Sequence, residues 1–299
     1  MSTPHSSSVI RMMIERVDTQ LDEGKTNEAA RTAETAVEAS RRAVEANGED
    51  TPILISALEK LGDLRREAGD YPSTETLYLE ALEWAKTVEI DSSQLARLKS
   101  SLAAVYDFSQ LPDCAIPLYE EAIALFESLS PPAELDVANL RNNLGMLYKE
   151  AGNFDRAEEN YIKSLEVFER VLGRDDPDVA AVYNNLGTLY YSSGYSAQAR
   201  EMHNYALEIR SKISEPNHPD LGQSYSNLAT VLHELGEDDE ALKNYETALR
   251  ILEDNIDSDG ETFYIVSSNF AALMRDLGKV RKAQAIEKRT QKLLKRQTA

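Results

Sequence analysis

Cysteine, histidine and long apolar runs are scarce in this chain of 299 residues. The single cysteine, Cys114, excludes an internal disulfide, and a lone small residue of this kind is more often a packing residue than a nucleophile. The four histidines occur without an HExxH motif or a cysteine pair, which predicts no bound metal. No apolar stretch has the length of a signal-peptide core or of a membrane span. We therefore expect a cytoplasmic protein.

Motifs for catalysis and cofactor binding are also missing. The sequence has no GxxxxGK, GxGxxG or GxSxG, the patterns that hold phosphates or present a nucleophilic serine. Residues 255–266 place Asp257, Asp259 and Gly260 as in a calcium loop, but Asn255 and Val266 stand at its first and twelfth positions. This segment is better explained as a turn between repeats, where Asp, Ser and Gly are common. We expect no cofactor and no enzyme activity.

Basic residues are fewer than acidic ones in this sequence. The chain has 32 Lys and Arg residues against 52 Asp and Glu, a formal net charge of −20. A surface of this sign repels phosphate groups, so nucleic acid and anionic membranes are unfavourable partners. With 42% hydrophobic and 28% charged residues, the composition is typical of a folded protein.

What the chain does contain is an internal repeat. The segment "NNLGMLYKEAGNFDRAEENY" begins at Asn142, and a close copy begins at Asn184. The leucine of this pattern recurs at a constant interval of 42 residues, at Leu144, Leu186, Leu228 and, as phenylalanine, at Phe270. Earlier copies contain Leu102 and Leu61, and a weaker one comes first, so seven units fill the chain.

Each unit predicts two helices. Apolar residues spaced by four, three and four form one stripe on the first helix, as in Leu140, Leu144 and Leu147. Glycines then end this helix, because glycine adopts a left-handed backbone without steric cost. The second helix brings a small residue to the crossing, such as Ala157 or Ala199. Between units, Pro177 and Pro219 suit the first turn of the following helix, with Asp or His nearby to cap it.

The recurring Leu-Gly-Tyr-Gly-Ala-Tyr pattern resembles the tetratricopeptide repeat, and the 42-residue spacing with "NNLG", "ALEIR" and "HPDL" is similar to that of kinesin light chains. The resemblance implies an all-α fold, a right-handed α-α superhelical solenoid of about seven helix pairs. We expect a flexible tail at residues 1–9 and a single solenoid at 10–299. Its units are expected at about residues 10–50, 51–93, 94–136, 137–178, 179–220, 221–262 and 263–299.

The resemblance also implies a protein-interaction scaffold or adaptor, which binds an extended peptide or protein segment in a groove lined by the first helices. An asparagine recurs at one groove position, and its amide can pair with a peptide backbone. It can equally be a polar surface residue copied by duplication, or bond a neighbouring helix. In the earlier units, Lys60 and Ser101 break the pattern. The predicted binding residues are Asn139, Asn143, Asn185, Thr188, Gln223, Asn227, Thr230 and Asn269.

Charge narrows the choice of partner. Glu150, Glu234 and Asp276 are expected to face the groove, where only Lys60 and Arg97 are basic. Such a groove favours a neutral or basic protein segment over an acidic one. Residues 279–299 carry eight basic residues against one acid, which suggests a polar outer face of the last unit. Alternatively this basic helix docks on the acidic body of another copy, so that the chain self-assembles head to tail as a homo-oligomer.

Overall fold

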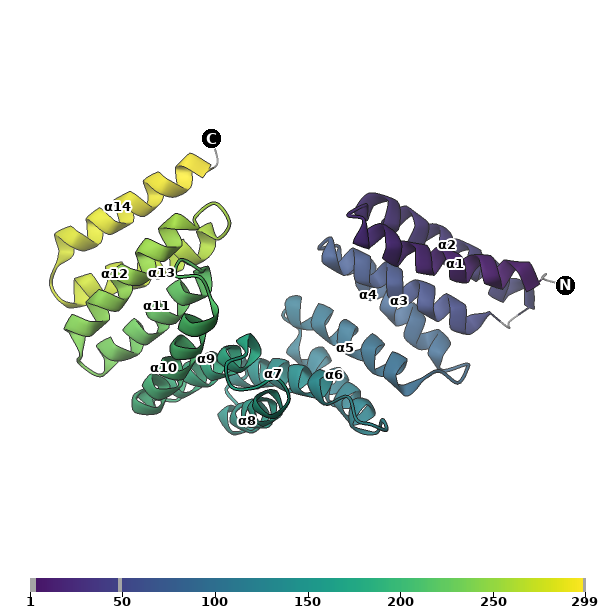
Figure 1. Ribbon diagram of the computed structural model, residues 1–299, viewed down its shortest axis with the longest axis horizontal. Coiled ribbons are helices and arrows are strands. Elements are labelled where there is room, and N and C mark those ends of the chain that lie inside the picture. The colour runs from purple at the N-terminus through teal and green to yellow at the C-terminus, as the bar shows by residue number, and fades with distance from the viewer. Residues whose placement is uncertain (1–3, 48–49, 298–299) are drawn as a thin grey trace. The chain divides into compact units, whose positions relative to one another are not determined.

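The computed structural model describes residues 4–47 and 50–297, and this part of the chain contains fourteen helices and no strand (Figure 1). In chain order the helices are α1 Pro4–Asp22, α2 Thr26–Asn47, α3 Thr51–Glu67, α4 Tyr71–Ala85, α5 Ser92–Phe108, α6 Pro112–Glu127, α7 Glu134–Glu150, α8 Phe154–Val171, α9 Pro177–Ser192, α10 Ser196–Ile213, α11 Pro219–Glu234, α12 Asp238–Asp254, α13 Gly260–Asp276 and α14 Val280–Gln297. The all-α prediction is confirmed. None of the described helices is long and apolar enough to cross a membrane.

The helices pack as consecutive pairs. The first helix of a pair lies against the second, as in α3 with α4, α9 with α10 and α11 with α12. The second helices α2, α4, α8, α10 and α12 each contact the first helix of the next pair. This is the packing of a repeat solenoid. The chain divides into two compact units, residues 1–140 and 141–299, and the boundary lies within α7.

Each compact unit has its own apolar core. In residues 1–140 the core includes Leu54, Leu58 and Leu98, all fully buried. In residues 141–299 a second core is centred on α11 to α14 and includes Tyr245 and Phe270. The apolar stripe expected on the first helices is buried, with Leu144 and Leu147 each 2% exposed.

Each expected unit contains one helix pair, but the boundaries differ. The first helix begins at Pro4, so residues 4–9, which we expected to belong to a flexible tail, form the first turns of α1. Ser7 donates a hydrogen bond to Asp50 (2.7 Å) and Ile10 is buried, which holds this end against the following repeat. Residues 1–3 of the expected tail and residues 298–299 lie outside the described chain.

Caps explain where several first helices begin. Pro177 and Pro219 are the first residues of α9 and α11, as predicted, and both helices start two residues before the expected units. The Asp176 carboxylate accepts a hydrogen bond from the Asp178 amide (2.9 Å), which satisfies a free donor at the helix end. Asp259, from the segment that resembles a calcium loop, accepts in the same way from the Thr262 amide (3.2 Å) and caps α13.

A left-handed residue ends most first helices. Gly152, Gly194 and Gly236 have φ values of 73°, 81° and 78°, which confirms the predicted glycine stops. In the third repeat the equivalent residue is Gln110, whose φ is 58° and whose side chain is exposed. A residue with a Cβ atom is strained in this conformation.

The two helices of a pair meet through small residues. Ala157, Ala199, Ala241 and Ala283 are fully buried on the second helices, as predicted. On the first helix, Gly145 lies so close to the Tyr161 ring that an added Cβ would be 2.6 Å from a ring carbon. The next repeat has the same close contact between Gly187 and His203, so this histidine occupies a core position that tyrosine occupies in its neighbours.

We expect Gln110→Gly to stabilise the protein by about 1 kcal/mol, because glycine removes the steric cost of the left-handed conformation. Chemical denaturation of residues 1–299 measures this change. The control is Ser109→Gly, one residue earlier, where φ is −80°. It should destabilise the protein, since glycine there only adds flexibility to the unfolded chain. Equal effects of the two substitutions would contradict the expectation.

His203 should make stability depend on pH. The side chain is 2% exposed, and burial, with a smaller effect of the charged Arg210, lowers its pKa from 6.5 to about 4. The unfolded chain therefore takes up a proton before the folded protein does. The stabilisation is complete above pH 6.5 and declines as the pH falls towards 4, by up to about 3 kcal/mol. His203→Tyr, the residue of the neighbouring repeats, should flatten this part of the pH profile in thermal melts. An unchanged profile would show that other groups cause it.

Candidate functional site

The predicted binding residues lie on first helices. Seven of the eight belong to residues 141–299, on α7, α9, α11 and α13. Gln223 and Asn269 are exposed, whereas Asn143, Asn185 and Asn227 are partly buried. We call the surface formed by these positions of α9, α11 and α13 the first-helix face.

Two of the asparagines form hydrogen bonds between repeats. The Asn185 amide donates to the Asn142 side-chain oxygen at 3.0 Å, and the Asn227 amide donates to the Asn184 side-chain oxygen at 2.8 Å. These two contacts, which we call the amide bridges, join α7 to α9 and α9 to α11. Of the possibilities that the sequence left open, bonding to a neighbouring helix therefore holds for Asn185 and Asn227.

Sequence reasoning missed the acceptor residues Asn142 and Asn184. The sequence did contain a sign of them, because two of the predicted asparagines directly follow another asparagine. In each bridge, the first asparagine of one repeat accepts from an asparagine 43 residues later, in the next repeat. In the next repeat Ser226 replaces the first asparagine and is 3% exposed, and Asn269 on the following first helix is exposed.

Each amide bridge leaves polar groups for another partner. A side-chain amide has two N–H donors and an oxygen with two lone pairs. The bridge uses one donor of Asn185 or Asn227, so the second N–H and the oxygen of each have no hydrogen-bond partner among the described residues. The bridges also restrict side-chain rotation, which lowers the entropy that binding would cost.

Thr188 and Thr230 form hydrogen bonds within their own helix pairs. Thr188 donates to the Asn184 carbonyl one turn earlier (3.0 Å). The Thr230 hydroxyl contacts the Tyr245 hydroxyl of α12 at 2.8 Å, which links the first-helix face to the buried core. Asn139 lies in residues 1–140, is exposed, and donates to the Leu135 carbonyl of its own helix (2.9 Å).

Acidic groups lie on the first helices of residues 141–299. Glu150, Glu234 and Asp276 are exposed. His233 contacts the Asp238 carboxylate at 2.7 Å, and its other ring nitrogen lies 3.6 Å from Asp276. The two basic residues expected in the groove belong to the other unit and are paired with acids: Lys60 with Asp18 (2.6 Å) and Arg97 with Glu59 (3.0 Å).

The family of the chain follows from its repeats. A model described as tetratricopeptide repeat matches residues 53–128, 136–212 and 196–254, which together make up more than half of the chain. The chain belongs to the tetratricopeptide repeat family. No curated protein matches it.

Two solved structures with repeats of this kind are similar to this tetratricopeptide repeat protein. BtubC (BKLC) from P. vanneervenii is 34% identical over 76% of this chain and 90% of that one, with a TM-score of 0.63. A putative kinesin light chain from Podosopora anserina, with nearly identical repeats, is 20% identical over 71% of this chain and all of that one (TM-score 0.59). The repeats are therefore similar to those of kinesin light chains, as the sequence indicated.

A Rap protein, crystallised in complex with Competence and Sporulation Factor, matches over 98% of this chain and 99% of that one, with a TM-score of 0.56. The identity is 11%, so this likeness concerns the fold alone.

The amide bridges should contribute to stability. Asn142→Ala and Asn185→Ala should each destabilise the protein, and a double-mutant cycle should give a coupling energy of about 1 kcal/mol, the typical net value of one hydrogen bond. Urea denaturation measures it. The control cycle pairs Asn142→Ala with Asn227→Ala, which share no bond and should be additive. A coupling energy near zero in the first cycle would show that the bridge contributes nothing.

Proposed function

We propose that this tetratricopeptide repeat protein is an interaction scaffold that binds an extended segment of another protein along the first-helix face. The main support is the pair of amide bridges: they hold the side chains of Asn185 and Asn227 in place and leave a donor and an acceptor of each uncommitted. An extended peptide presents its backbone N–H and C=O groups at regular intervals, so it can pair with amides whatever its side chains are.

The chemistry of the neighbouring positions supports a neutral or basic partner. Gln223 and Asn269 add exposed amides, and Glu234 and Asp276 add negative charge on the same helices. Like charges brought together at an interface cost free energy, so an acidic segment is disfavoured. The Rap protein crystallised with Competence and Sporulation Factor shares the fold, which is consistent with a scaffold built to hold a partner.

Self-assembly through α14 stays the alternative. Ile286, Leu293 and Leu294 pack on the apolar core, while basic residues such as Lys288, Lys292 and Lys295 are exposed. This arrangement suits a helix whose apolar side completes the core, and it also presents positive charge to an acidic surface.

Peptides selected from a random peptide library against the full chain test the proposal. We expect selected peptides to be neutral or basic, and Asn185→Ala with Asn227→Ala to weaken them about tenfold or more, since each substitution removes one hydrogen bond of about 1 kcal/mol. The matched control, Asn204→Ala with Asn244→Ala, changes two asparagines on second helices and should leave affinity unchanged.

Thermal melts of both double variants separate binding from folding. The first variant must remain folded at the temperature of the binding assay, because it also loses the amide bridges. If the selected peptides bind the two double variants equally well, the first-helix face is not the binding surface.

A further inference from the structure

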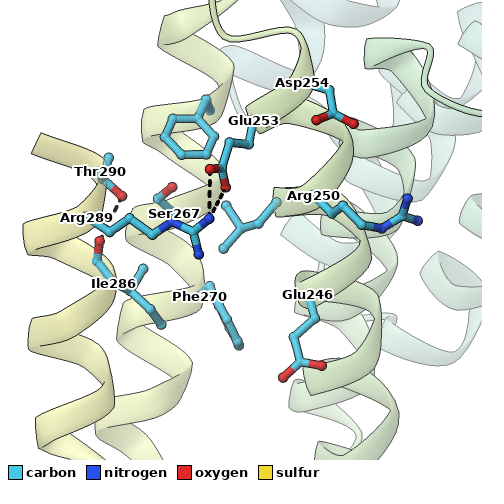
Figure 2. Close-up of a pocket in the computed structure, with 11 residues that line it drawn as sticks. Glu246, Arg250, Glu253, Asp254, Ser267, Phe270, Ile286, Arg289 and Thr290 are labelled. Carbon is cyan, nitrogen blue, oxygen red and sulfur yellow. Dashed lines mark hydrogen bonds and ion pairs between the residues drawn. The ribbon is translucent and has the colours of Figure 1, made fainter. Parts of the chain in front are cut away.

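The opposite side of the helix pairs has a pocket that the first-helix face does not include. It has a volume of about 480 Å³ and lies between the second helices α12 and α14, with α13 behind them. Phe263 and Leu249 line it with apolar surface. So do Phe270 and Ile286, which are labelled in Figure 2. Charged residues Glu246, Arg250, Glu253, Asp254 and Arg289 also line it.

The same pocket occurs two repeats earlier, between α8 and α10 with α9 behind them. Seven lining positions correspond, each separated by two repeat lengths of 42 residues. The corresponding residues are Ile162 and Glu246, Leu165 and Leu249, Glu169 and Glu253, Tyr183 and Ser267, Leu186 and Phe270, Met202 and Ile286, and Tyr205 and Arg289. The earlier pocket therefore shows what each position of the later one can contact.

In the earlier pocket, which has a volume of about 670 Å³, a tyrosine of the chain itself forms part of the wall. The Tyr183 hydroxyl donates to the Glu169 carboxylate at 2.9 Å, and its ring lies against that of Tyr205 with 5.2 Å between the centroids. A tyrosine also occupies this position in the repeat between them, as Tyr225. In the later pocket the corresponding residue is Ser267, so the ring is missing.

Ser267 supplies an independent sign of a missing group. It is 2% exposed, and its hydroxyl has no hydrogen-bond partner among the described residues. The neighbouring Ser268, by contrast, donates to the carbonyl of Tyr264 one turn earlier at 2.9 Å. A buried hydroxyl without a partner is costly, which makes Ser267 a favourable contact for a ligand's polar group.

Of the two partners of the tyrosine ring, the later pocket keeps the carboxylate and has an arginine in place of the second ring. Glu253, at the position of Glu169, is held by Arg289, whose Nη2 lies 2.7 Å from each carboxylate oxygen. Figure 2 shows Arg289 extending from α14 to Glu253. A carboxylate can accept several hydrogen bonds, so Glu253 can also accept one from a phenol. Arg289 stands where Tyr205 stands, and a guanidinium stacks on an aromatic ring as a second ring does.

We propose that this pocket binds the unphosphorylated side chain of a tyrosine from a partner protein. The phenol ring occupies the place that Tyr183 occupies two repeats earlier, against Phe270 and Arg289, and its hydroxyl bonds Glu253 or Ser267. The charged lining has three acids and two arginines, so a phosphate on the tyrosine would meet net repulsion. This site is separate from the proposed peptide surface, because it lies between second helices.

The probe for this site is N-acetyl-L-tyrosinamide, followed by nuclear magnetic resonance of the methyl groups of Leu249 and Ile286 in the full chain. We expect shifts of these methyl signals with a dissociation constant on the order of 1 mM, as befits a ligand of this size. N-acetyl-L-phenylalaninamide, which lacks the hydroxyl, should bind roughly three- to tenfold more weakly. The phosphotyrosine analogue should bind more weakly still. Equal binding of all three would overturn the proposal.

Substitutions locate the site. Ser267→Tyr restores the residue of the two preceding repeats, and it should raise the melting temperature and reduce probe affinity at least tenfold. Its matched control, Ser268→Tyr, adds the same ring at the next, exposed position of α13 and should leave affinity unchanged. Equal affinity in both variants would overturn the proposal.

If Ser267→Tyr does not fold, Glu253→Gln serves instead. It keeps the volume of the pocket, and it should remove most of the preference for the tyrosine probe over the phenylalanine probe. A preference that persists in this variant would overturn the role of Glu253. Asn185→Ala with Asn227→Ala should leave probe binding intact, so this test is independent of the proposed peptide surface.

Discussion

The contact between a small residue on one helix and a large ring on the next is the constraint on which the rest of the structure depends. Gly145 allows the Tyr161 ring to lie against the backbone of α7, and the same contact brings His203 against Gly187. Because the interior is close-packed, this distance sets how near the two helices of a pair can approach. Successive first helices then come close enough for the side chains of Asn142 and Asn185 to form a hydrogen bond.

The different sides of a first helix therefore make different contacts. Leu186 and Leu228 form part of the buried stripe, and the asparagine pairs bridge to neighbouring first helices. Towards the second helices, the same helices carry Tyr183 and, in α13, Ser267. A binding surface on one side and a pocket on the other can thus coexist in one repeat, because the helical period separates their residues.

Departures from the repeat are as informative as the repeat itself. His203 for tyrosine places a titratable ring in the core, and Gln110 for glycine introduces backbone strain. Ser267 for tyrosine leaves a buried hydroxyl unsatisfied. Duplication supplies a reference for each such position, since the neighbouring repeats show which other side chain occupies the same place.

The sequence by itself determined the helical class, the period, the glycine stops such as Gly194, and the prolines that begin α9 and α11, because these depend on local backbone preference and on spacing along one helix. Only the tertiary structure decided what the polar residues do. The bond from Asn185 to Asn142 spans 43 residues, and the pocket at Ser267 needs three helices to form. Spacing along the chain does not contain such contacts, because they depend on how far apart the packed helices come to lie.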